Sequence, residues 1–129
     1  MPDLPLRALV VDDEPDVQLL FTQRFRREVR QGLVDFRFAM SGPEALQVLH
    51  DGGAADVVLV LSDINMPGMT GIELLRLIKT EFPELRVMMV TAYDNAELQR
   101  EALEAGAEGY LTKPLDFTEL KRDVFRIAA

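Results

Sequence analysis

Three carboxylates, one hydroxyl and one ammonium group stand directly after short apolar runs of this sequence. They belong to Asp12, Asp13, Asp63, Thr91 and Lys113. Carboxylates held close together repel one another and do not all stay ionised without a partner. Mg²⁺ resolves such repulsion because it takes oxygen ligands and combines one or two carboxylates with a phosphate. If the fold brings these groups together, they predict a magnesium site.

A carboxylate in such a site is also a nucleophile that can form an aspartyl phosphate. Phosphoryl transfer depends on neutralising charge and on positioning, with little covalent chemistry for the protein to supply. Mg²⁺ and Lys113 supply positive charge, and the Thr91 hydroxyl can hydrogen-bond a phosphoryl oxygen. The residue types therefore predict phosphoryl chemistry at one of the carboxylates.

Five short apolar runs alternate with five longer amphipathic segments along the chain. The runs are Leu6–Val11, Leu33–Met40, Val57–Leu61, Arg86–Val90 and Gly109–Leu111. Nearly continuous Val and Leu are typical of parallel strands that are covered on both faces. The segments between them repeat apolar residues at three- and four-residue steps, which predicts helices. The alternation predicts an α/β fold of five βα units with helices on both faces of a parallel sheet.

The second predicted strand ends at Met40 and Ser41 without a charged residue. If this strand lies at the sheet edge, beyond the first, the other four strand ends are contiguous, as in the order 2-1-3-4-5. Ligands of open α/β sheets bind outside the carboxyl ends of the strands. Asp63 follows the third strand and is then central among the polar groups.

Cap signals mark the predicted helices. In each of four cases a Ser, Thr or Asp is followed three residues later by Glu, at Ser41, Thr70, Asp94 and Asp116. Glycines follow three predicted helix ends, at Gly32, Gly52–Gly53 and Gly106. The first predicted helix is a single one, with apolar residues at Val17, Leu20, Phe21, Phe25 and Val29.

Composition excludes several classes of protein. The 129 residues, of which 48% are hydrophobic, predict one domain over 1–129 with its core over about 6–127. The absence of cysteine excludes disulfides and thiolate metal sites. With 14 basic and 22 acidic residues the net charge is −8, which disfavours nucleic acid and anionic membranes as partners. No signal or membrane-spanning segment is visible, so we expect a cytoplasmic protein.

The sequence resembles the receiver domain of two-component response regulators. The matching stretches are Val10–Pro15, Ser62–Gly71, Val90–Ala92 and Gly109–Pro114. Each motif alone is weakly specific, but all four occur in order and each lies at a predicted strand end. The resemblance covers almost the whole chain and implies a flavodoxin-like fold with the strand order 2-1-3-4-5.

The resemblance implies a role for each polar group. Asp63 is the implied phosphoacceptor and one of the metal ligands, and its donor is a phosphohistidine on a sensor histidine kinase or histidine phosphotransfer protein. Asp13 is implied to bind Mg²⁺ directly, Asp12 through water, and Asn65 through its backbone carbonyl. Lys113 is implied to pair with the phosphoryl group, before a cis peptide bond to Pro114.

The resemblance also implies a conformational switch. Thr91 turns toward the phosphoryl group and the aromatic ring of Tyr110 moves from exposed to buried. The face formed by the fourth helix, fifth strand and fifth helix, over about 95–129, then controls a downstream protein or a fused output domain, or forms a homodimer. Asn65 and Tyr93 occupy positions that tune the lifetime of the phosphoryl group.

Two other functions compete with such a switch, which would catalyse only its own phosphorylation and dephosphorylation. A Mg²⁺-dependent phosphatase is disfavoured because the Asp-x-Asp-x-Thr spacing and room for a cap domain are missing. A pseudo-receiver that only binds partners is disfavoured by the intact polar set. No phosphate-binding glycine loop follows a strand. The sequence leaves open whether the receiver stands alone or is one domain of a longer protein.

Positive charge is concentrated in the first predicted helix, at Arg24, Arg26, Arg27 and Arg30. A solvated helix face explains such a cluster in most proteins. The alternative is a docking surface for an acidic partner, such as the phosphodonor.

Overall fold

The computed structural model describes residues 5–93 and 95–128. Their five strands form one parallel sheet in the order β2-β1-β3-β4-β5, which confirms the predicted fold class and topology. The strands are β1 (Leu6–Val11), β2 (Val34–Ala39), β3 (Leu59–Asp63), β4 (Arg86–Thr91) and β5 (Gly109–Thr112).

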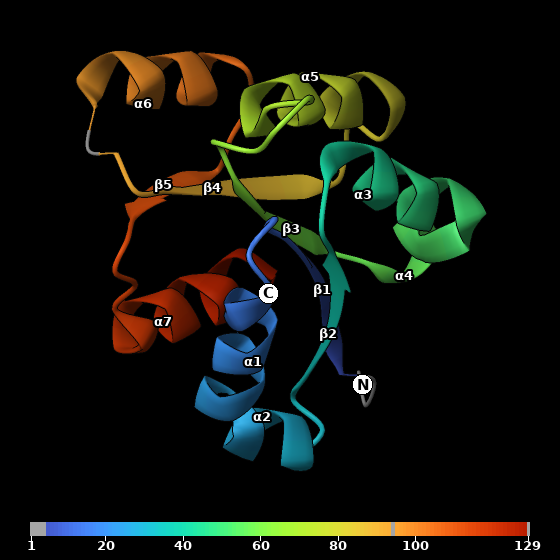
Figure 1. The fold of residues 1–129 in the computed structure, drawn as a ribbon. Helices are drawn as coiled ribbons and strands as arrows, with labels where there is room; N and C mark the ends of the chain where they lie inside the picture. Colours follow the sequence, from blue (N-terminus) through green and yellow to red (C-terminus); the bar gives the residue numbers. More distant parts are fainter. Residues whose placement is uncertain (1–4, 94, 129) are drawn as a thin grey trace.

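Helices cover both faces of the sheet (Figure 1). The helices are α1 (Pro15–Arg24), α2 (Arg26–Arg30), α3 (Gly42–Val48), α4 (Ala54–Asp56), α5 (Gly71–Glu81), α6 (Ala96–Glu104) and α7 (Phe117–Ala128), with a wide turn η1 (Leu49–Gly53) between α3 and α4. The first two and α7 lie on one face, and α3, α5 and α6 lie on the other. Within the part of the chain that the structure describes, no helix has the length and apolarity needed to cross a membrane.

Successive residues of a strand point to opposite faces, so the sheet divides the core into two apolar layers. In β1, Leu9 packs with α5 residues such as Leu75, whereas Val10 packs with Phe21 of α1 and Leu120 of α7. Burying one such side chain contributes about 1.5–3 kcal/mol. Because both faces are covered, the central strands are apolar almost throughout, which is the pattern seen in the sequence.

Four strands differ from their predicted bounds, and two of these, β4 and β5, differ only by one added residue at the end. The third begins at Leu59, two residues later than predicted, and runs on to include Asp63. Val57 instead closes the preceding turn, since its N–H bonds to the carbonyl of Gly53, and the side chain of Val58 is exposed. The second strand is shorter by one residue at each end and spans Val34–Ala39.

The single first helix was a wrong prediction, because the helix breaks at Phe25. This residue caps α1 with non-helical backbone angles, φ −102° and ψ 14°, and α2 starts after it. Phe21 and Phe25 are buried, but Leu20 and Val29 are exposed. The apolar period therefore continues across the break, although Leu20 before it and Val29 after it are exposed.

Helix starts follow three of the four cap signals. The side chains of Ser41, Thr70 and Asp116 accept hydrogen bonds from backbone N–H groups two or three residues ahead. The fourth signal, Asp94, lies outside the described residues. Asn95 caps α6 instead, because its Oδ1 accepts from the N–H groups of Glu97 and Leu98.

Gly71 sits at a close approach that positions Asp63. A Cβ atom at this position would overlap the backbone carbonyl oxygen of Asp63 and lie 2.8 Å from the Cα of Ile64. The N–H of Gly71 also donates to the carbonyl of Ile64 at 2.8 Å. The start of α5 therefore rests directly against the end of β3, and only glycine fits there.

We predict that Gly71→Ala lowers the free energy of unfolding by about 2–3 kcal/mol, because overpacked sites respond on this scale. Urea-induced unfolding measures the change. Gly32→Ala is the control, since its φ is +75° but nothing lies within 4 Å of an added Cβ, and it is expected to cost about 1 kcal/mol. Equal losses in the two variants would contradict the close-packing argument.

Candidate functional site

The ammonium group of Lys113 lies between two buried carboxylates at the carboxyl ends of the strands. Its Nζ is 2.9 Å from Oδ2 of Asp12 and 3.5 Å from Oδ2 of Asp63. Both aspartates are only 6% exposed. The strands β1 and β3 are adjacent, with Val11 opposite Ser62, so the residues that follow in each strand are brought side by side.

Thr91 is the last residue of β4 and is fully buried. In the register of the sheet Asp63 lies opposite Val90, so Thr91 is at the neighbouring strand end. Its Oγ1 accepts a hydrogen bond from the N–H of Tyr93 at 3.2 Å. The structure thus places Asp12, Asp63, Thr91 and Lys113 at one edge of the sheet, as the topology argument requires.

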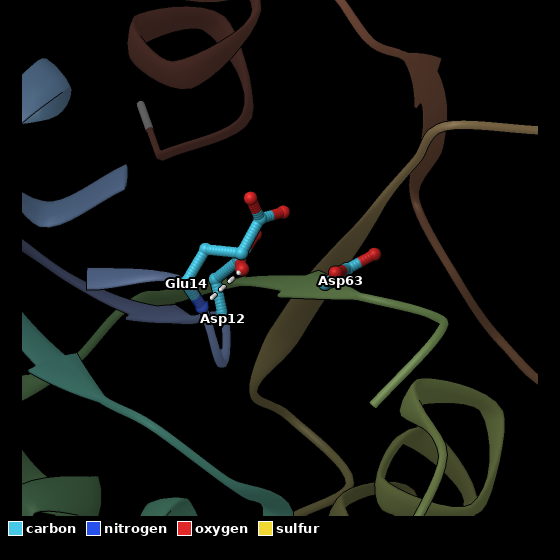
Figure 2. Close-up of side chains that lie close together, drawn as sticks. All are labelled: Asp12, Glu14 and Asp63. Carbon is cyan, nitrogen blue, oxygen red and sulfur yellow. Dashed lines mark hydrogen bonds between the residues drawn. The ribbon is translucent and has the colours of Figure 1, made fainter. Parts of the chain in front are cut away.

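A third carboxylate joins the cluster from an unexpected position. Oxygens of Asp12, Glu14 and Asp63 lie within 4.8 Å of one another (Figure 2). Oε1 of Glu14 is 3.7 Å from Nζ of Lys113, and the backbone N–H of Glu14 donates to Oδ1 of Asp12 at 2.9 Å. Sequence reasoning missed Glu14, although its place at the N-cap of α1, two residues after Asp12, was the available signal.

Asp13 is not a member of this cluster among the described residues. Its predicted role as a direct metal ligand, and that of the Asn65 carbonyl, stay predictions. The backbone N–H of Asn65 acts on the Asp63 carboxylate as a group that lowers its pKa. The donors of the cluster are carboxylate oxygens, the ligand type that Mg²⁺ takes. The residues present therefore fit a divalent cation.

Electrostatics set the protonation of the two central groups. Burial raises the pKa of the Asp63 carboxyl above its ordinary value, and the charge of Asp12 raises it further. Lys113 and the N–H of Asn65 act in the opposite direction without outweighing these effects. Burial by itself lowers the pKa of Lys113, but the hydrogen bond and charge of Asp12 outweigh it and the net pKa is raised. Lys113 is therefore a permanent cation beside a carboxylate that is costly to ionise.

The remaining predicted residues, Tyr110 and Pro114, lie in β5 and directly after Lys113. Tyr110 is half-buried, and its hydroxyl donates to the backbone carbonyl of Tyr93 at 2.8 Å. The peptide bond between Lys113 and Pro114 is cis, as the resemblance implied. Thr91 and Tyr110 are thus both hydrogen-bonded to the backbone of Tyr93.

We predict that Asp63→Asn stabilises the folded chain at pH 7 in metal-free buffer. The pKa of Asp63 is raised in the folded state above 3.8, so its ionisation favours unfolding. Removing the charge should raise Tm by about 2–5 °C. The gain is complete above the folded-state pKa and disappears below pH 3.8, where the carboxyl is protonated in both states.

Thermal unfolding of Asp63→Asn and of the exposed control Asp56→Asn measures this effect across the acid range. The control should shift Tm by less than about 1 °C, since exposed charges contribute little. A Tm for Asp63→Asn below that of the unsubstituted chain at pH 7 would contradict the electrostatic account.

Comparison with known proteins gives a consistent result. Residues 8–125 match the model of the response regulator receiver domain. The chain is 34% identical to the chemotaxis protein CheY of Pseudomonas aeruginosa over 124 residues, which covers 95% of each protein. It is 35% identical over 117 residues to the response regulator protein PilR of the same species, which covers 89% of this chain but 24% of PilR.

A solved structure shares the fold over nearly the full length. The response regulator protein TrrA of Thermotoga maritima, solved in complex with Mg²⁺ and BeF, superposes with a TM-score of 0.80. The two are 31% identical, and the match covers 95% of this chain and 98% of TrrA. With the sheet order, the acidic strand ends and the sequence match in agreement, the chain belongs to the response regulator receiver domain family.

Proposed function

We propose that this chain is a cytoplasmic phosphorylation switch of a two-component relay. Asp63 accepts a phosphoryl group from a phosphohistidine on a sensor histidine kinase or histidine phosphotransfer protein. The observation that carries the proposal is the ammonium of Lys113 held between buried Asp12 and Asp63. Phosphorylation on aspartate and Mg²⁺ binding are general properties of the receiver family, and this site has the residues for both.

In the transfer step an ionised oxygen of Asp63 attacks the phosphorus of the phosphohistidine. The new O–P bond forms as the P–N bond breaks, and the bond electrons leave with the imidazole nitrogen. Lys113 holds its positive charge beside the oxygens of the arriving group, which stabilises negative charge there. When bound at the acidic cluster, Mg²⁺ would neutralise further charge on the phosphoryl oxygens. The chain catalyses only its own phosphorylation and dephosphorylation.

The Thr91 hydroxyl connects this chemistry to a distant face. Thr91 accepts from the N–H of Tyr93, and the carbonyl of Tyr93 accepts from the hydroxyl of Tyr110. If Thr91 moves toward a phosphoryl oxygen, it shifts the backbone segment that holds Tyr110. Tyr110 lines a groove of about 300 Å³ between α6, β5 and α7, together with Gln99 and Glu119.

We propose that a downstream protein or a fused output domain binds at this α6–β5–α7 face. A phosphorylation-dependent homodimer could use the same surface. Hydrogen bonds connect Thr91 through the backbone of Tyr93 to Tyr110. We therefore expect a small movement of Thr91 to change the shape of the groove.

Acetyl phosphate with Mg²⁺ provides the first test. We predict that the chain gains one phosphate by intact mass spectrometry and that Asp63→Asn gains none. Asp56→Asn, at an exposed position, should be phosphorylated like the unsubstituted chain. Lys113→Ala should lower the phosphorylation rate by about 100-fold or more, in line with removal of a charge-stabilising group from a reaction site.

Two outcomes of that experiment would overturn the proposal. An adduct that persists in Asp63→Asn would move the phosphoacceptor to another residue. No adduct under any condition would favour a pseudo-receiver that acts only by binding. Steady turnover of an added phosphomonoester would instead show a phosphatase.

Two of the candidate metal ligands in the β1–α1 loop, Asp13 and Glu14, lead to separate predictions. We expect Asp13→Asn to weaken Mg²⁺ binding by about tenfold or more, because even outer-shell partners of a metal account for about 10- to 100-fold. Glu14→Gln should weaken it less, since its carboxylate is 65% exposed and remains solvated. Isothermal titration with MgCl₂ measures both. A larger loss in Glu14→Gln would assign the direct ligand to Glu14.

A further inference from the structure

The outer edge of β2 combines unpaired backbone groups with alternating charges. Among the described strands β2 pairs only with β1, so its other edge has no partner strand. Phe36 and Phe38 pack on the α1 side of the sheet, and Asp35 and Arg37, which alternate with them, are exposed on the other side. An unpaired edge of this kind is a template for another strand.

Hydrogen bonds to β1 determine which groups of β2 are directed outward. The carbonyls of Leu33 and Ala39 accept from the N–H groups of Leu6 and Asp12, both at 3.0 Å. Within a strand the N–H and C=O of one residue point to the same side, and those of the next residue to the other side. The odd-numbered residues therefore face β1, and the even-numbered residues direct their N–H and C=O groups away from the sheet.

We propose that this edge binds a second copy of the chain, through antiparallel pairing of the two β2 strands about a two-fold axis at Phe36. The outward-directed Phe36 groups of the two copies then form a hydrogen-bonded pair, and Val34 of each pairs likewise with Phe38 of the other. The ladder contains about six hydrogen bonds. The ten strands form one continuous sheet.

Opposite charges across the interface favour this register of the two strands. With the axis at Phe36, Asp35 of each copy lies opposite Arg37 of the other, at the positions where side chains approach most closely. An axis at Asp35 places two carboxylates opposite each other, and an axis at Arg37 places two guanidinium groups opposite each other. Like charges at such positions destabilise pairing. The interface is self-complementary, as a two-fold interface must be.

Both charged groups are available for these pairs. Arg37 is exposed and makes no ion pair within residues 5–93 and 95–128. Asp35 is contacted by Arg7 through Oδ2 at 3.6 Å. That contact leaves Oδ1 of Asp35 for the guanidinium of the second copy.

The surroundings of β2 have room for the second strand. A groove of about 290 Å³ runs beside it and is lined by Thr22, Arg26, Val29, Arg30, Asp35, Phe36 and Phe38. Val29 is 42% exposed, so a second copy would cover apolar surface there. The basic helix α2 lies beside the start of β2 (Figure 1). Antiparallel pairing therefore separates the two α2 helices to opposite ends of the ladder and limits their repulsion.

Sedimentation velocity from micromolar to millimolar protein tests this pairing. We expect the unphosphorylated chain to associate reversibly to a dimer. Arg37→Asp should weaken association by about tenfold or more, because it turns two attractive cross-strand pairs into repulsive ones. The matched control is Arg100→Asp, which makes the same charge change at an exposed residue of α6, next to the opposite edge of the sheet. It should leave association unchanged.

A charge swap separates the proposal from an unspecific loss of folding. Asp35→Arg alone should weaken association in the same way, but an equimolar mixture of D35R and R37D should form a heterodimer, since each copy then presents the opposite charge to the other at both positions. A monomeric parent chain at every concentration would overturn the proposal, and the edge would then be left to a different partner. Equal effects of R37D and R100D, or a mixture that stays monomeric, would also overturn it.

Discussion

The functional site depends on the ammonium group of Lys113, which pairs with two buried carboxylates. Two aspartates with 6% exposure lie at adjacent strand ends, and their charges repel in a medium that screens poorly. The contacts of Lys113 with Asp12 and Asp63, at 2.9 and 3.5 Å, do not outweigh burial and the charge of Asp12, and the pKa of Asp63 stays raised. The site therefore retains negative charge that Lys113 does not neutralise. This is the condition that favours binding of a divalent cation.

The parallel topology places these groups without any dedicated loop. Every strand of a βα unit ends at the same edge of the sheet, so a polar residue directly after an apolar run is carried to that edge. Placing β2 at the outside removes from the cluster the one strand that contributes none of Asp12, Asp63, Thr91 and Lys113. Tight packing then fixes the positions, as where the start of α5 rests on the backbone of Asp63 at Gly71. Thr91 and Tyr110 are linked in the same structure, because both hydrogen-bond to the backbone of Tyr93.

Strand identity was predictable because it depends on the apolar pattern, which the covered faces of the sheet impose. The strand order was predicted from the uncharged end of the second strand and from the family resemblance. Local departures from this pattern were harder to predict from the sequence. The break at Phe25 is hidden, because the apolar spacing continues across it into the exposed Val29. Glu14 was missed because an exposed acid at a helix start usually has no partner, and only its 3.7 Å distance from Lys113 links it to the cluster. Asn95 caps α6, although its sequence neighbour Asp94 is of an equally suitable residue type. The preferences of cap residues alone do not decide between the two.

The two edge strands of the sheet, β5 and β2, have different consequences for binding partners. At the β5 end, hydrogen bonds link the groove beside Tyr110 to Thr91 at the acidic site, so under the proposed function binding there would be coupled to phosphorylation. At the β2 end, the exposed charges of Asp35 and Arg37 have no contact with Asp63 or Lys113 among the described interactions. A pair formed through β2 therefore leaves both acidic clusters and both α6–β5–α7 faces accessible. Association at that edge would act by bringing two switches together, with no need to change how either one is phosphorylated.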